Sequence, residues 1–346
     1  ITFKEDSVKP DSQGKAWLVY ECLAKGLEIM TGQYDVLKSS LYGRSNSVPS
    51  AYQNDGNGSL LALTNGHQIR GNQEGKALTF KFKELFNGLD TIDCIGMGVE
   101  TTNGVEKVVI ENRKYFYQDE VLKRYNNVPK INLERAKNLY YNQIIIGFEK
   151  WENESYNSLD EFNTKVIRNN DFKAVQNKYQ RLSKFLGSGY ALEIVRREQF
   201  KENPTKGNKY DNSNLFIVIR EVNGEYKPEK DEAFGTIENL ISPPSSYNLR
   251  ISPTRNMIKH SQWFNGSMLK KQLDSFDFAE GFGNYELITN LSVGNSSEQV
   301  DRNIHEGADF VANTLEAPIF TPDYATFSVP FELGFWLELR EGANRY

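Results

Sequence analysis

The stretch of residues 79–117 constrains the fold most, because it joins a helical pattern to a hairpin signal. Apolar side chains first recur at the spacing of one helix face, at Leu85, Phe86, Leu89 and Ile92. Apolar residues then alternate with small or polar ones on both sides of Asn103-Gly104, a dipeptide that favours a tight hairpin turn. The sequence therefore predicts a helix followed by a β-hairpin. A hairpin cannot bury its own apolar face, so we expect this unit to pack on further strands.

Similar patterns predict further elements along the chain. An amphipathic helix begins near Ala16 and is expected to end at Thr31-Gly32, with the glycine as its C-terminal cap. Ser252-Pro253 has the composition of a helix start, with serine as the N-cap. Asn223-Gly224 repeats the hairpin signal. Alternating or β-branched runs predict strands at residues 142–151, 162–167, 190–197 and 215–222, and again after residue 281.

A chain of 346 residues is long for a single hydrophobic core, so the length favours two or three domains. The predicted fold class is α+β, with β-rich, barrel- or sandwich-like domains and the helix–hairpin module. Composition changes, including a proline pair at residues 243–244, mark the boundaries. The predicted segments are a helix-led N-terminal segment (1–75), the helix–hairpin module (76–127), a β-rich barrel-like domain (128–240) and a helix with a C-terminal β segment (241–346).

Charge and hydropathy exclude several classes of protein. The net charge of −5 provides no basic footprint for nucleic acid. No apolar run reaches the roughly 18 residues that a membrane-spanning helix needs. We therefore expect neither a nucleic-acid partner nor a membrane span. The chain begins with isoleucine and lacks a charged-then-apolar leader, so we expect it to be a processed or excised piece of something longer.

Residues that commonly carry chemistry are few and scattered. Cys22 and Cys94 lie in apolar surroundings and are interpreted as buried hydrophobic residues instead of a disulfide or metal pair. The three histidines, His67, His260 and His305, occur in unlike contexts without a nucleophile or zinc motif. The oxygen-rich run at residues 54–58 lacks the ligand spacing of a calcium loop and is interpreted as a turn. We expect no catalytic residues, no cofactor and no metal.

Two sets of charged residues have alternative interpretations. Arg250, Arg255, Lys259 and His260 gather near a predicted helix start, where they could bind an anion. The same set is also typical of a solvated face, or of a face that meets acidic groups of a partner chain. Glu100 and Glu111 lie on the predicted hairpin, and we expect both to face solvent.

The order of elements resembles a known family of viral proteins. A helix with "KELFNGLDTI" precedes the hairpin "IGMGVE…NGVEKVVIENRKYFY", a polar spacer and the strand "NLYYNQIIIGFEKWENE". This order resembles the hub proteins of phage tails and related contractile injection machines, in which an asparagine precedes a β-branched run, here Asn142 before Ile144. "GSLLALTNGHQIRG" and "SSYNLRISPTRNMIKH" are similar to tail-associated proteins of phages and prophages of gut bacteria. The resemblance implies a structural virion protein without a cofactor, located in the tail as an oligomer with other tail or baseplate proteins.

Three functional hypotheses follow. The first is assembly in a phage tail or baseplate hub, with Tyr117, Trp151 and Trp263 as aromatic contact residues and Arg255 as a polar partner. The second is a secreted or cell-surface carbohydrate-binding protein that stacks exposed tyrosine and tryptophan on sugar rings. The third is a tail-associated glycosidase or lysozyme-like enzyme, which needs two carboxylates roughly 5–10 Å apart in a groove.

Overall fold

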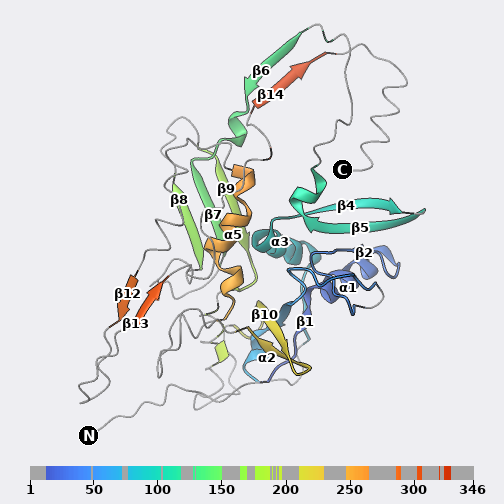
Figure 1. Cartoon of the computed structure of the whole chain (residues 1–346), viewed down its shortest axis with the longest axis vertical. Helices are drawn as coiled ribbons and strands as arrows, with labels where there is room; N and C mark the ends of the chain where they lie inside the picture. Colours follow the sequence, from blue (N-terminus) through green and yellow to red (C-terminus); the bar gives the residue numbers. More distant parts are fainter. Residues whose placement is uncertain are drawn as a thin grey trace.

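The fold consists of several small sheets arranged around short helices (Figure 1). The structure is a computed structural model. It describes residues 13–47, 50–71, 77–102, 104–117, 128, 130–149, 164–169, 176–187, 189, 192, 195–196, 210–229, 247–264, 286–289, 302–305, 319 and 323–328. The class is α+β, as predicted. The sheets in these ranges are open, and none of them is closed into a barrel.

The helix–hairpin module forms as its pattern predicts. Helix α3 (Phe82–Asp93) leads into strands β4 (Ile95–Thr102) and β5 (Val105–Asn112), and Gly104 takes the positive φ that the turn requires. The short strand β2 (Leu37–Lys38) pairs with β5 in parallel, which gives a sheet in the order β2-β5-β4. A 3-10 turn, η1 (Arg113–Phe116), follows β5.

A second sheet combines segments that are distant in sequence. Its order is β1-β3-β10-β11. The strands are β1 (Trp17–Leu18), β3 (Leu61–Asn65), β10 (Asn214–Val222) and β11 (Glu225–Pro228). Asn223 and Gly224 both adopt positive φ angles, so the second predicted hairpin is confirmed. Helix α1 (Val19–Thr31) packs beside this sheet and ends at Gly32 in the left-handed conformation, as predicted, while the short α2 (Gly66–Ile69) follows β3.

A third sheet has the order β8-β7-β9 and is covered by helix α5. Its strands are β8 (Lys165–Asn169), β7 (Gln143–Phe148) and β9 (Lys178–Ser183). The turn η7 (Leu249–Ile251) precedes α5 (Pro253–Lys259), which α6 (Ser261–Phe264) continues. Ser252 accepts a hydrogen bond from the backbone N–H of Arg255, so it is the predicted N-cap.

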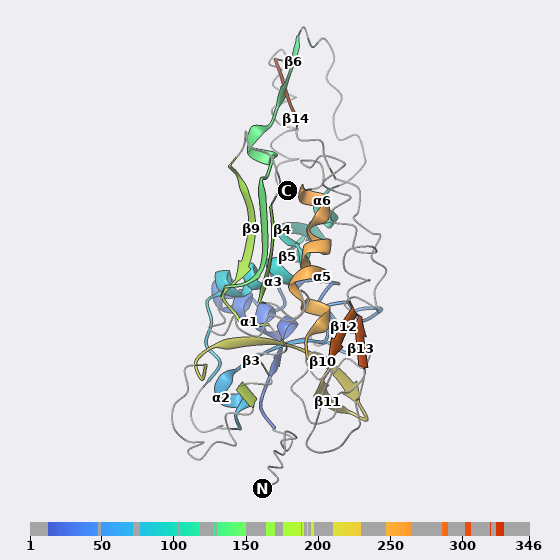
Figure 2. The ribbon, with the colours of Figure 1, turned by 90° about the vertical axis from the view of Figure 1, so that its left-hand side faces the viewer.

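Two further pairs of strands stand apart from these sheets. Strand β6 (Ile131–Arg135) pairs with β14 (Asp323–Phe327), and β12 (Glu286–Thr289) pairs with β13 (Arg302–His305). The β6–β14 ribbon lies at one end of the long axis of the molecule, with the turn η2 (Lys137–Leu139) at its base (Figures 1 and 2). Among the described residues, no helix is long and apolar enough to cross a membrane.

The buried apolar side chains form three clusters. The largest joins α1 and α3 to the first two sheets and includes Leu23, Leu89 and Phe216. The second lies between the third sheet and α5–α6, around Met257 and Phe264. Because residues of all four predicted segments share sheets or cores, packing crosses the expected boundaries: β3 pairs with β10 and β6 with β14.

The third cluster corrects one strand prediction. Leu192, Val195 and Arg196, within the stretch 190–197 expected as a strand, are helical. Leu192 and Val195 are both buried and pack into the third cluster with Leu215. Residues three apart lie on one face of a helix but on opposite faces of a strand, so burying both favours the helix.

Candidate functional site

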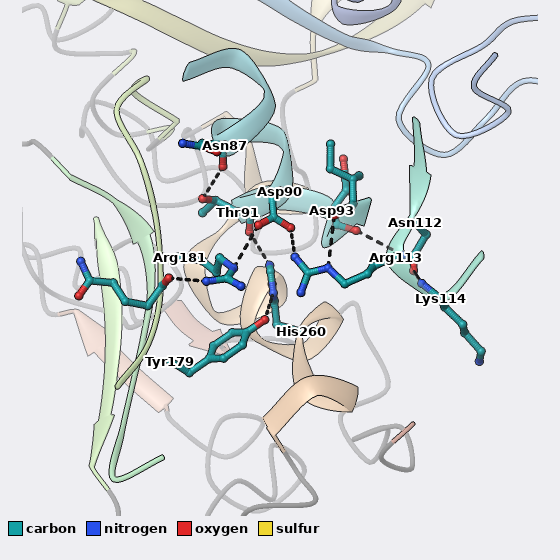
Figure 3. Close-up of polar contacts among 12 residues, drawn as sticks. Asn87, Asp90, Thr91, Asp93, Asn112, Arg113, Lys114, Tyr179, Arg181 and His260 are labelled. Carbon is teal, nitrogen blue, oxygen red and sulfur yellow. Dashed lines mark hydrogen bonds and ion pairs between the residues drawn. The ribbon is translucent and has the colours of Figure 1, made fainter. Parts of the chain in front are cut away.

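The most concentrated polar contacts lie where α3, η1, β9 and α5 meet, and we call this group the polar junction (Figure 3). Asp90 on α3 forms ion pairs with Arg113 of η1 and with Arg181 of β9, the latter at 3.1 Å between Asp90 Oδ2 and Arg181 Nε. Burial raises the pKa of Asp90, and the two guanidinium groups oppose this effect. One carboxylate therefore joins two elements that follow α3 in the chain.

His260, at the end of α5, is fully buried in the same junction. Its Nε2 lies 3.2 Å from the carbonyl oxygen of Thr91, and its Nδ1 lies 2.9 Å from the hydroxyl of Tyr179. A carbonyl oxygen only accepts, so Nε2 carries the proton and Nδ1 accepts from Tyr179. Burial, assisted by Arg113 and Arg181, lowers the pKa of His260 to about 3, so the ring is neutral at pH 7.

The last turn of α3 completes the junction. Asp93 accepts hydrogen bonds from Lys259 on α5, at 2.7 Å, and from the hydroxyl of the buried Tyr42, at 3.0 Å. Cys94 caps α3 in the left-handed conformation, and burial raises the pKa of its thiol to about 12. The guanidinium of Arg113 also lies over the ring of Trp263, 4.9 Å from its centroid.

The contacts of the polar junction are those of a group that stabilises the fold. Its carboxylates meet cations or a phenol, and its histidine is neutral with both ring nitrogens engaged. A nucleophile or general base needs a pKa near the working pH and access to substrate, and neither His260 nor Cys94 meets these conditions. Within the described ranges, no group of three or more histidine, cysteine, aspartate or glutamate side chains could hold a metal ion.

Of the four residues predicted as partner contacts, the structure brings two together, Tyr117 and Trp263. Tyr117 is exposed, and its ring lies 5.0 Å from that of Trp263. Trp263 is buried against Tyr117 and Arg113, so its contacts are inside the chain. Arg255 lies half-buried on α5. Trp151 lies outside the described residues.

Three of the four basic residues near residue 250 contact groups of the same chain. Arg250 pairs with Glu229 at 3.3 Å, Lys259 pairs with Asp93, and His260 is buried in the junction. The acidic groups that these cations meet belong to the same chain. One sequence interpretation expected these cations to meet acidic groups, but it placed those groups on a partner chain.

The expectation that Glu111 faces solvent is wrong. Its side chain is buried and accepts hydrogen bonds from the backbone N–H groups of Ser40 and Leu41. The loop that follows β2 covers this face of the hairpin, which alternation within the hairpin cannot reveal. Glu100 is partly exposed, as its strand position suggested, and binds Lys38 at 2.8 Å.

Other sequence predictions concern the run at residues 54–58, the two cysteines and the histidines. In the run at residues 54–58, Asp55 accepts hydrogen bonds from the backbone N–H and the hydroxyl of Ser45, as a turn residue does. Cys22 and Cys94 are free and buried, as predicted. His67 is buried on α2, and His260 is buried at the end of α5.

The most distinctive surface is the β6–β14 ribbon, which sequence reasoning missed. Its register places Ile131 opposite Phe327 and Leu133 opposite Ala325 on one face. The exposed fractions are 58% for Ile131, 76% for Leu133 and 39% for Phe327. Opposite residues of an antiparallel pair share a face, so the other face carries the polar residues between them, Asn132, Glu134, Tyr324 and Thr326. The ribbon is therefore amphipathic, with its apolar face uncovered.

A second exposed apolar surface lies on the hairpin. Met97 and Val99 of β4 lie opposite Ile110 and Val108 of β5. Ile110 is fully buried, whereas Met97 and Val99 are 53% and 49% exposed. The apolar face of this sheet thus extends one strand beyond the core that covers it.

Comparison of the chain with protein-family models, with characterised proteins and with solved structures found no match.

Proposed function

We propose that this chain is a structural component of a phage tail, or of a phage-derived tail or baseplate hub, and that it acts by assembly. The observation that carries the proposal is the uncovered apolar face of the β6–β14 ribbon. Two strands alone are marginally stable in water, and apolar residues gain about 25 cal/mol for each Å² removed from it. A neighbouring subunit that covers Ile131, Leu133 and Phe327 supplies this missing layer.

The polar junction supports a positional mechanism. It joins α3 to β9 and α5 through ion pairs and hydrogen bonds, among them those of the fully buried His260. In this proposal the junction keeps the body of the molecule rigid, and the ribbon lies at the end of the long axis (Figure 2). Obligate interfaces in such assemblies bury on the order of 2,000 Å² or more, so the ribbon would be one contact among several.

The choice of a tail is supported by the resemblance in element order. The order of the helix–hairpin module (α3, β4 and β5) and the strand after Asn142 (β7) resembles that of tail hub proteins. In this proposal, the partners are other tail or baseplate proteins together with copies of the chain, and the location is the tail of the virion.

The test measures incorporation into tail particles. The gene is expressed in the cells that produce the particles, and the chain is quantified by mass spectrometry in purified particles and in the soluble fraction. We expect the wild-type chain in the particles and a loss of at least about tenfold for Leu133→Lys, because a charge on the apolar face must be desolvated on docking. Asn132→Lys, on the opposite face of the same strand, is the matched control and should be incorporated normally.

Three kinds of result would contradict the proposed function or the ribbon as its docking face. Absence of the wild-type chain from tail particles rejects the tail assignment. Equal incorporation of Leu133→Lys and Asn132→Lys rejects the ribbon as the docking face. Binding of the soluble chain to glycans, or cell-wall hydrolysis that one carboxylate substitution abolishes, would favour the carbohydrate-binding or glycosidase hypothesis instead.

A further inference from the structure

Strand β4 is an edge strand without the usual protection against pairing. In the sheet β2-β5-β4 it hydrogen-bonds to β5 on one side, and no other described strand pairs with it. Edge strands are commonly guarded by lysine, proline or a bulge. The edge strands β8, β9 and β11 follow this rule, with Lys165, Lys178 and Lys227-Pro228 respectively. Strand β4 contains no lysine, arginine or proline.

The one charged residue of β4 already has partners within the chain. Glu100 accepts hydrogen bonds from Lys38, at 2.8 Å, and from the hydroxyl of Tyr115, at 2.7 Å. On the same face, the Phe116 ring lies over two glycines of β4, since a Cβ built on Gly96 or Gly98 would come within 2.8 or 2.9 Å of it. The edge therefore has an ion-paired carboxylate and an aromatic ring on one face, and Met97 and Val99 on the other.

The sequence of β4 is complementary to itself in an antiparallel register. If Gly98 faces Gly98 of a second copy, Met97 lies opposite Val99 of that copy, and this apolar pair occurs twice about the two-fold axis. In the same register Glu100 lies opposite Gly96, so the two carboxylates do not face each other. A register centred on Glu100 would oppose them, which is unfavourable.

We propose that β4 pairs with β4 of a second copy of this chain, with Gly98 at the two-fold axis, to form a continuous six-stranded sheet from the three strands of each copy. The hairpin points away from the third sheet (Figure 1), and among the described strands only β5 pairs with β4. Pairing satisfies the free backbone groups of the edge and covers the apolar side chains that extend beyond the core. This inference deepens the proposed role in assembly. Its test uses the purified chain alone, so it succeeds or fails independently of the tail assignment.

The test uses charge reversal across the proposed register. One double variant is Met97→Lys/Val99→Lys and the other is Met97→Glu/Val99→Glu. Each alone places like charges directly opposite one another twice, whereas a mixture places lysine opposite glutamate twice. By analytical ultracentrifugation we expect a wild-type dimer, a dimer Kd raised about tenfold or more in each variant, and recovery of the dimer in the equimolar mixture. The matched control Ile29→Lys/Met30→Lys, at two exposed apolar positions on α1, should dimerise as the wild type does.

Several results would overturn the proposal. They are a wild-type chain that remains monomeric at the highest concentration reached, double variants that dimerise like the wild type, or a mixture that does not recover. A second measurement covers the case in which a double variant does not fold. In the wild type, hydrogen exchange of the β4 amides should slow as protein concentration rises, and exchange that is independent of concentration would reject pairing at this edge.

Discussion

At the scale of single residues, the side chain of Asn248 makes hydrogen bonds to the backbone of β10, as a neighbouring strand would. It is buried in the left-handed conformation, and its Nδ2 donates to the carbonyl oxygens of Gly187 and Phe216 at 2.9 and 2.8 Å. Its Oδ1 accepts from the backbone N–H of Val218 at 2.8 Å. Asparagine tolerates this backbone conformation better than most residues, and its amide provides both the donors and the acceptor required here.

We predict that Asn248→Asp destabilises the protein by roughly 3 kcal/mol, because the carboxylate cannot donate and two buried carbonyl oxygens lose their partner. Urea unfolding at pH 7 measures the change. Asn132→Asp, at an exposed position, should change stability by no more than about 0.5 kcal/mol. Similar losses in the two variants would contradict the role assigned to the Asn248 amide.

At the scale of elements, α3 approaches β10 closely through a glycine. A Cβ built on Gly88 would lie 2.9 Å from the Phe216 ring and 3.0 Å from the hydroxyl oxygen of Ser183. Phe216 and Ser183 are fully buried, so neither has room to move away. The helix therefore tolerates a residue of low helix propensity in order to pack against the sheet.

We predict that Gly88→Ala lowers the stability of the protein by about 1–3 kcal/mol, although alanine favours helix by about 1 kcal/mol over glycine. Asn87→Ala, one residue earlier on the exposed side of α3, raises helix propensity without a packing conflict. It should leave stability unchanged or slightly increased. Thermal unfolding of both variants tests this, and a stabilised Gly88→Ala variant would show that Phe216 can adjust.

At the scale of the whole molecule, the polar junction connects two hydrophobic cores. Phe216 and Leu89 belong to the first and Met257 and Phe264 to the second, while His260 and Asp90 lie between α3 and α5. The charge state of the junction should therefore influence global unfolding. The two groups act in opposite directions with pH, because the pKa of His260 is lowered and that of Asp90 is raised.

The sign for His260 follows from proton uptake. Its pKa falls from 6.5 to about 3 on folding, so between these values the unfolded chain binds the proton and the native chain does not. Stability from this group is complete above pH 6.5 and falls as the pH is lowered, by up to about 1.4 kcal/mol per pH unit. The raised pKa of Asp90 partly offsets this fall near the acid end.

We predict that His260→Gln flattens the pH dependence of stability between about pH 6 and pH 4 relative to the wild type, whatever its stability at pH 7. Urea unfolding at pH steps of half a unit measures both profiles. Parallel profiles would mean that His260 titrates normally in the folded protein, which would contradict its burial.

The sequence by itself determined the features that depend on neighbours along the chain. The helical period at residues 82–93, the positive φ at the hairpin turns, the glycine cap after Thr31 and the Ser252 N-cap all follow from local spacing and backbone preferences. The fold class follows from the same elements.

Only the tertiary structure decided which faces meet. The burial of Glu111 depends on a loop some 70 residues away, the neutral His260 depends on α3 and β9, and the β6–β14 ribbon joins strands separated by about 190 residues. A periodic pattern states that a face is apolar or polar, but it does not state what covers that face. The uncovered ribbon on which the proposed function rests is therefore visible only once distant strands are paired, because pairing aligns Ile131 with Phe327 and Leu133 with Ala325 on one side.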